Sequence, residues 1–233
     1  MPNPEAFVFY SACVSTAILV DAAFFLHKYA RLYGKGHDAE TTAQTLHRMC
    51  LEHLEHEGIP SRELYRIFVY DCPPLTKKAH NPIDGKSVNF SKTPLAAFRL
   101  AFHDELRKLR KVALRLGYLD EDYAEWQPRA EVLKKLLRGE MVHADLKPED
   151  VTYYSKQKGV DMRIGLDIAS MAFKQQVTQM ILISGDSDFV PAAKLARREG
   201  IDFVLDPLWT PIREDLNEHV DGLQTVAPKP SKA

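Results

Sequence analysis

Two aspartates one residue apart follow a short apolar segment in the last third of the chain. Asp186 and Asp188 come after residues 179–184, a mostly aliphatic run that ends in Ser184, and Gly185 separates the run from the acids. An apolar run of this length predicts a β-strand that is buried on both faces. A helix that starts after this strand needs only one of the acids as its N-cap. The second carboxylate therefore indicates a ligand for a cation.

More aspartates stand where other predicted elements begin or end. They are Asp21 after residues 16–20, Asp71 after residues 64–70, Asp161 at the start of a helix, and Asp206 after residues 202–205. The carboxyl ends of parallel strands share one edge of a sheet, where α/β proteins bind ligands. Carboxylates gathered there repel one another unless a cation neutralises them. Donors that are all oxygen select a hard ion, Mg²⁺ or Mn²⁺, which predicts metal-dependent hydrolysis of a phosphodiester bond.

The elements that must position these acids alternate along the chain between strands and helices. The spacing of apolar residues predicts helices over residues 22–32, 40–57, 94–116, 161–174 and 189–199. Strands that are joined by helices lie parallel and are connected by right-handed crossovers. The predicted fold class is therefore α/β, a three-layer α/β/α sandwich with a central, mostly parallel sheet.

The middle third of the chain is less regular. It begins with a polar loop over residues 76–93, and the type of the elements between residues 126 and 139 stays open. We interpret residues 75–150 as a helical insertion in a single domain that spans residues 1–227. Residues 228–233, rich in proline and lysine, predict a disordered tail.

The bulk composition is that of an ordinary globular protein. Hydrophobic residues make up 45% and charged residues 27% of the 233-residue chain, which argues against global disorder. The formal net charge of -1 neither favours nor excludes a nucleic-acid substrate, because an acidic site offsets a basic surface in the total. The three cysteines are far apart and predict free thiols. The apolar stretch 7–20 is too short to span a membrane, so we expect a cytoplasmic protein without membrane contact.

Taken together, the motifs resemble the NYN domain of the LabA-like branch, also called the DUF88 family, a group of PIN-like ribonucleases. The residues that carry the resemblance are Lys158-Gly159-Val160-Asp161 with Asp167, the run from Ser184 to Phe189, Pro191, Ala196-Arg197 and Gly200. It extends to Asp21 in the first strand, to the segment 70–74 and to residues 216–223, so it covers nearly the whole chain. The resemblance implies a PIN-like fold and metal-dependent cleavage of RNA.

Matched motif by motif, the acidic site of the family falls on Asp21, Asp161, Asp186 and Asp188, which are the expected catalytic and metal-binding residues. The family often has an asparagine three residues after its first aspartate, whereas this chain has Phe24. A phenylalanine can neither ligate a metal ion nor bind phosphate. The second hypothesis is therefore a catalytically weak NYN module that binds RNA or a protein partner. A small-molecule phosphatase is disfavoured, because the position two residues after Asp21 holds Ala23 in place of a second acid.

Residues beside the acids have expected supporting roles. Lys156, Lys158, Ser184 and Ser187 are predicted to bind the substrate, through its phosphates or through water. Asp167 lies about 240° around the helix from Asp161, so we assign it a structural role or one behind the direct metal ligands. The partner we expect is RNA, guided by a basic loop in which aromatic residues alternate with cations, although solvated lysines explain the same charges. The loop cations are Lys77, Lys78, Lys86, Lys92 and Arg99. A homodimer is a further expectation.

Overall fold

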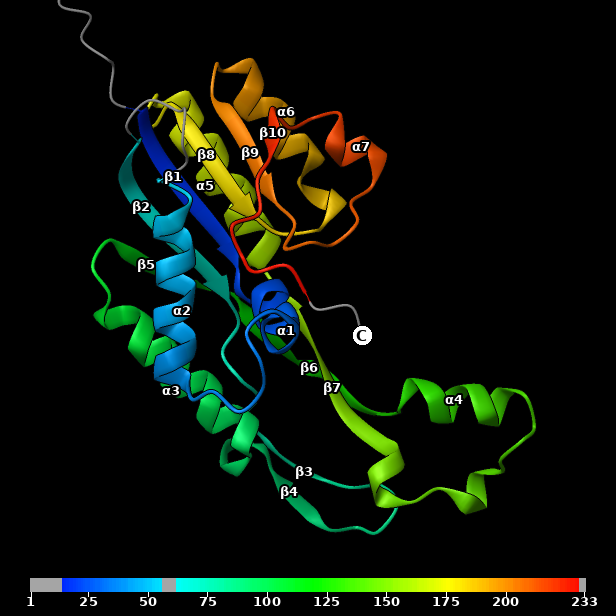
Figure 1. Ribbon diagram of the computed structural model, residues 1–233. Coiled ribbons are helices and arrows are strands. Elements are labelled where there is room, and N and C mark those ends of the chain that lie inside the picture. The colour runs from blue at the N-terminus through cyan, green and yellow to red at the C-terminus, as the bar shows by residue number, and fades with distance from the viewer. Residues whose placement is uncertain (1–13, 56–61, 231–233) are drawn as a thin grey trace, which may run out of the picture.

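A six-stranded sheet forms the centre of the computed structural model, which describes residues 14–55 and 62–230 (Figure 1). In spatial order the strands are β10 (Gly222–Leu223), β9 (Asp202–Asp206), β8 (Gln179–Ile183), β1 (Val14–Asp21), β2 (Arg62–Asp71) and β5 (Val112–Leu116). Each strand lies parallel to its neighbours. This topology places the carboxyl ends of all six strands at one edge of the sheet.

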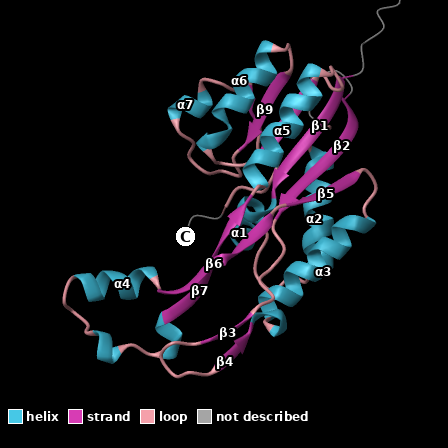
Figure 2. Ribbon diagram, turned by 180° about the vertical axis from the view of Figure 1, so that it is seen from behind, coloured by secondary structure: helices cyan, strands magenta, loops and turns pink. Residues whose placement is uncertain are grey.

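Helices cover both faces of the sheet. One face carries α1 (Ala22–Leu32), α2 (Ala39–Glu52) and α3 (Pro94–Lys108), and the other carries α5 (Val160–Phe173) and α6 (Val190–Arg198), as Figures 1 and 2 show. The short helix α7 (Glu214–Asn217) packs beside α6, where Leu216 joins the second core. The arrangement confirms the predicted α/β fold with its parallel sheet, and the layers are those of a PIN-like sandwich.

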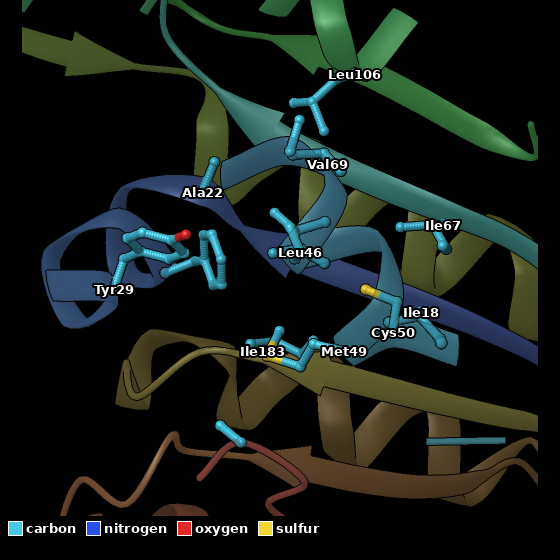
Figure 3. Close-up of a cluster of buried hydrophobic side chains, with 14 of the residues drawn as sticks. Ile18, Ala22, Tyr29, Leu46, Met49, Cys50, Ile67, Val69, Leu106 and Ile183 are labelled. Atoms are coloured by element: carbon cyan, nitrogen blue, oxygen red, sulfur yellow. The ribbon is translucent and has the colours of Figure 1, made fainter. Parts of the chain in front are cut away.

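The side chains of the central strand alternate between two cores. Ile18 and Val20 point into the core under α1 and α2, whereas Ala17 and Leu19 point into the core under α5 and α6. Figure 3 shows the first core, where Leu46 of α2 packs among residues of β1 and β2. Because both faces are covered, residues 17–20 of this strand are all apolar, and this run makes the strand predictable from the sequence.

The predicted helix over residues 94–116 is wrong in its last part. Helix α3 ends at Lys108, Lys111 takes a left-handed conformation with φ of 62°, and residues 112–116 form the edge strand β5. The side chains of Val112 and Leu114 share one face of this strand and pack on the core, whereas the helical spacing placed all residues up to 116 in one helix. Pairing of β5 with β2 supplies the backbone hydrogen bonds that a longer helix would have supplied.

An arm, which we define as residues 118–158, leaves the sheet beyond β5 (Figures 1 and 2). Its strands β6 (Tyr118–Pro128) and β7 (Val151–Lys158) form an antiparallel ribbon, and α4 (Ala130–Leu137) lies at its tip. A small hairpin of β3 (Lys78–His80) and β4 (Ser87–Asn89) lies beside the ribbon. The middle third thus contains strands as well as helices, and its β5 belongs to the central sheet. The division into one domain with an insertion at residues 75–150 stays a prediction.

Other element ends differ by a few residues from the sequence-based expectation. Helix α2 ends at Glu52, five residues before the predicted end. Of the predicted tail, residues 231–233 lie outside the described part, and Lys229 extends its amine over the Trp209 ring at 5.7 Å. Within residues 14–55 and 62–230, no helix has the length and apolar character needed to cross a bilayer.

Candidate active site

Asp21 is the last residue of β1 and caps the helix that follows. Its Oδ1 accepts a hydrogen bond of 3.1 Å from the backbone N–H of Phe24, which satisfies one free amide of α1. Parallel pairing sets Val20 beside Ile183 of β8, so Asp21 stands next to the segment that follows β8. The first and the last third of the chain therefore meet at this edge of the sheet.

Asp186 and Asp188 lie in the turn after β8. The buried Ser184 accepts a hydrogen bond of 3.3 Å at its Oγ from the N–H of Asp186. Asp186 in turn caps the short 3-10 helix η4 (Ser187–Phe189), because its Oδ1 accepts from the N–H of Asp188 at 3.0 Å. The turn uses one acid as a cap and leaves the carboxylate of Asp188 outside the capping bond.

Asp161 belongs to the first turn of α5. The residue before this helix is Gly159, in the left-handed conformation with φ of 79°, and no side chain caps the helix. Asp161 is thus not the N-cap that its position at the helix start suggested. Burial raises its pKa, and the charges of Asp186 and Asp188 raise it further. This electrostatic effect means that the start of α5 lies close to the turn after β8.

The site is electrostatically strained in the absence of a cation. Burial is the main cause that raises the pKa of Asp21 to about 6, and the charges of Asp161 and Asp71 add to it. Hydrogen bonds from the N–H groups of Phe24 and Ala23 act in the opposite direction. The charge of Asp161 therefore acts on Asp21, and the charges of Asp186 and Asp188 act on Asp161. Electrostatic repulsion thus links all four predicted acids.

The oxygen donors of this site fit a hard divalent cation, but the carboxylates are too far apart for three of them to bind one ion directly. Among the described residues, no group of three or more Asp, Glu, His or Cys side chains is drawn together closely enough to hold an ion. Mg²⁺ retains several of its waters and needs only one or two direct carboxylates. The four acids can therefore serve such an ion in part directly and in part through water.

Phe24 is a component of the site that no metal-binding motif indicates. A β-carbon placed on Gly185 would lie 2.9 Å from Cε2 of the Phe24 ring, so the ring packs directly against this glycine. The Lys28 amine lies 5.7 Å from the centre of the same ring. Phe24, in the first turn of α1, thus hydrogen-bonds to Asp21 through its N–H group and packs its ring on the turn that carries Asp186.

Two further acids of the sheet edge have basic side chains as partners within the protein. Asp71 is buried and forms an ion pair with Arg99, while His103 Nε2 lies 2.7 Å from its Oδ2. Asp206 is also buried, and His53 Nε2 lies 2.9 Å from its Oδ2. Asp71 therefore has a cationic partner inside the protein, and Asp206 has a buried imidazole within hydrogen-bond distance. The spacing of Arg99 and His103, one turn apart on α3, was the signal in the sequence for this pairing.

The predicted supporting residues fall in different places. Ser184 and Ser187 lie in the turn after β8, within the site. The Lys158 amine forms an ion pair with Asp120 of the arm, and Lys156 is exposed on the arm. Asp167 accepts a hydrogen bond of 2.8 Å from the Tyr70 hydroxyl and pairs with Arg115 at 3.3 Å. These contacts tie α5 to β2 and β5.

A parallel α/β/α sandwich with carboxylates at the carboxyl edge of its central strands places this protein in the PIN-like class. The model of the NYN domain matches residues 83–208, which is more than half of the chain, and the chain belongs to the NYN domain family, a PIN-like nuclease family. This match confirms the resemblance seen in the sequence. It includes Asp161, Asp186 and Asp188, whereas Asp21 lies before it.

Comparison with solved structures gives a protein of unknown function from Vibrio parahaemolyticus. The two chains are 16% identical, with a TM-score of 0.47, and the match covers 92% of this chain and 93% of the Vibrio chain. Comparison with curated proteins gives no match.

Proposed function

We propose that the protein is a Mg²⁺- or Mn²⁺-dependent endonuclease that hydrolyses phosphodiester bonds in RNA. The observation that carries the proposal is the convergence of four carboxylates from three parts of the chain, where burial, and after it repulsion between the carboxylates, raises the pKa of two of them. Sites at which acids repel one another in this way are typical of metal-dependent catalysis. Asp21, Asp161, Asp186 and Asp188 would hold the ion, which when bound supplies an activated water and a counter-charge for the phosphate.

The residues of the chain itself have distinct roles in this proposal. Asp186 and Ser184 are fixed by the hydrogen bonds of the turn, so they hold a constant position at the sheet edge. Asp188 supplies a carboxylate that is free of the capping bond. Ser187 lies beside it at the start of η4, and in this proposal its hydroxyl binds a phosphate oxygen. Asp167 positions α5 through Tyr70 and Arg115.

The test is cleavage of labelled RNA and DNA in Mg²⁺ and in Mn²⁺. We expect Asp186→Asn combined with Asp188→Asn to abolish cleavage, since it removes two charges while the amide introduced at position 186 still caps η4. The matched control is Asp104→Asn, which changes an exposed acid on α3. Cleavage that persists in the double variant, with the protein folded, would overturn the proposal.

A second candidate function is an NYN module that binds RNA without cutting it. The observation in its favour is the Phe24 ring, which packs on Gly185 and occupies space next to Asp21. This candidate predicts RNA binding without turnover at any metal concentration. Phe24→Asn, which restores the amide often found in the family, would then create cleavage in an inactive wild-type protein. Cleavage by the wild-type protein excludes this candidate.

We also propose that the protein works in a reducing compartment, the cytoplasm. Cys50 and Cys72 are free and buried in the two cores, and burial raises the pKa of both thiols. Thiols of this kind are unreactive packing residues. Cys13 lies outside the described residues.

A homodimer that forms through α5 is the last part of the proposal. The outer side of this helix carries a stripe of apolar residues that no other part of the described chain covers, spaced at four, three and four residues. These residues are Met162, Leu166, Ala169 and Phe173. A two-fold axis between Leu166 and Ala169 places Met162 opposite Phe173 of the partner subunit, which makes the stripe complementary to itself.

A further inference from the structure

A cavity of about 340 Å³ lies between the arm and the rest of the molecule. Its walls come from the loop after β2, from the start of α3 and from β7. The residues that matter here are Pro73, Phe90, Leu95, Arg99, Tyr153 and Tyr154. The lining is mostly apolar, with a few polar groups, as in sites for small organic groups, and the volume is at the lower end for such sites.

The cavity adjoins the acidic edge of the sheet. Pro73 comes two residues after Asp71, so the two α-carbons lie within about 7 Å of each other. At the other side Gln157, also in the lining, comes four residues before Asp161. Asp71 is also close enough to Asp21 for its charge to raise the pKa of Asp21. The cavity therefore opens near the same edge of the sheet as the four carboxylates, and a chain molecule can extend from one place to the other.

One wall of the cavity is a rigid group of aromatic rings. The rings of Phe90 and Tyr153 are stacked, with centres 5.3 Å apart and an angle of 23° between their planes. The Trp126 ring meets Tyr153 edge-on at 5.4 Å. Since the group forms its own contacts, it offers a preformed flat surface without loss of side-chain freedom on binding. Tyr154, also in the lining, is 50% exposed and free to stack on a ligand.

The opposite wall carries a guanidinium group and the N-terminus of a helix. Arg99 lines the cavity with a side chain that is 14% exposed and is fixed by its ion pair with Asp71. Thr93, Leu95 and Ala96 in the first turn of α3 also line it, so the positive end of this 15-residue helix faces the cavity. Flat apolar rings on one side and positive charge on the other match the two halves of a nucleotide.

We propose that this cavity binds one unpaired base of a single-stranded RNA, next to the linkage that is cut, while Arg99 and the start of α3 face the adjoining phosphate. This inference rests on the proposed nuclease function and names its substrate as single-stranded. A base that is paired in a duplex cannot enter the cavity, because its faces are covered by its neighbours. Stacking tolerates all four bases, so we expect weak sequence preference.

The test measures binding without cleavage. Fluorescence anisotropy of a labelled oligouridylate is recorded in EDTA, and the same measurement is made with an RNA duplex and with an abasic strand of equal length. We expect Tyr154→Ala to weaken binding of the oligouridylate about tenfold. Tyr154→Phe keeps the ring and the affinity. The matched control is Tyr123→Ala, which removes a 78% exposed ring of the same arm outside the cavity and leaves affinity unchanged.

Leu95→Asp gives an independent measurement. Leu95 is 69% exposed at the cavity, and an aspartate in the first turn of α3 favours the helix dipole, so the variant folds. Its negative charge repels phosphate, and we expect weaker binding of single-stranded RNA.

The inference is overturned by wild-type affinity in both Tyr154→Ala and Leu95→Asp, by equal affinity for the abasic strand, or by absence of RNA binding. A different result separates the two proposals. If neither the wild type nor any variant cleaves RNA, while RNA binding and its weakening by Tyr154→Ala persist, the proposed nuclease function is refuted and the cavity stays a base-binding site.

Discussion

The aspartates at the edge of the sheet differ in what neutralises them. Asp71 faces Arg99 and His103, and Asp206 faces His53. Asp21, in contrast, receives backbone N–H groups and faces other carboxylates. The protein thus pairs two acids with basic side chains, whereas within the described residues the four acids that we assign to the metal site form no ion pair. This difference, more than the number of acids, locates the place where an external cation would stabilise the fold.

Asp21→Asn tests this strain through the pH dependence of stability. The pKa of Asp21 rises from its ordinary value of 3.8 to about 6, so the folded state keeps its proton over a range in which the unfolded chain has lost it. The free energy of unfolding of the metal-free protein therefore falls as the pH rises through this window. The Asn side chain still caps α1. We expect the variant to be more stable than the wild type at pH 7 by about 1–3 kcal/mol and equal below pH 4.

Urea denaturation in EDTA at a series of pH values measures this effect. Mg²⁺ at pH 7 should stabilise the wild type and have less effect on Asp21→Asn, because the variant has less repulsion to relieve. A difference between the two proteins that is the same at pH 4 and pH 7 would contradict the assignment of strain to Asp21.

Gly185→Ala tests the contact between Phe24 and the turn after β8. The added methyl group would lie 2.9 Å from the ring, which is too close for two carbon atoms. We expect a loss of stability of about 1 kcal/mol, at the low end for overpacking because the half-buried ring can tilt. Thermal unfolding measures the loss. In a double-mutant cycle, Phe24→Ala should remove most of the penalty of the alanine, and strictly additive effects would show that the two residues do not touch.

At the scale of elements, helices and strands could be predicted from the sequence where the apolar residues kept a single spacing along the segment. Residues 17–20 of β1 and 180–183 of β8 are all apolar because both faces of the sheet are covered, and the helix over residues 22–32 was predicted with its observed bounds. The edge strand β5 was missed, because apolar residues of a short strand continued the helical pattern of α3. Only the partner strand β2, distant in sequence, decides between the two structures.

The candidate site shows the same limit. The position of Asp21, Asp161, Asp186 and Asp188 near one another followed from the rule that parallel strands end at one edge. The pairing of Asp206 with His53 could not be predicted from the sequence, because the two residues are 153 positions apart and meet only in the folded chain. The ion pair of Lys158 with Asp120 depends likewise on the ribbon of the arm, which no local pattern indicated.

The pairing of α3 with β2 predicts a large effect for Asp71→Ala. The variant leaves the guanidinium of Arg99 and the ring of His103 buried without their acceptor. Removal of one partner from a buried ion pair costs about 3–5 kcal/mol, so we expect a loss of this size in urea denaturation. Asp104→Ala breaks an exposed ion pair with Arg107 on the same helix and should change stability little. Similar losses in both variants would mean that Asp71 is not the anchor of α3.

At the scale of the whole molecule, two apolar surfaces stay uncovered within the described chain. One is the stripe on α5, where Leu166 is 62% exposed and no atom lies within 4 Å of the place where Gly165 would carry a β-carbon. The other is the tip of the arm, where Leu133 and Leu137 of α4 are exposed. The α5 stripe is the better candidate for contact with a second copy, because a two-fold axis sets its small residue, Ala169, opposite Leu166 of the partner subunit and leaves room for that side chain.

Leu166→Glu tests the homodimer. A charge at the centre of the stripe would be buried against Ala169 of the partner subunit, next to the two-fold axis, and its desolvation would oppose association. We expect the wild type to sediment as a dimer at micromolar concentration and the variant as a folded monomer, measured by analytical ultracentrifugation with circular dichroism as the check on folding. Leu137→Glu, at the tip of the arm, is the matched control and should leave the dimer intact. A monomeric wild type refutes the dimer, and dissociation by Leu137→Glu alone would move the interface from α5 to the arm.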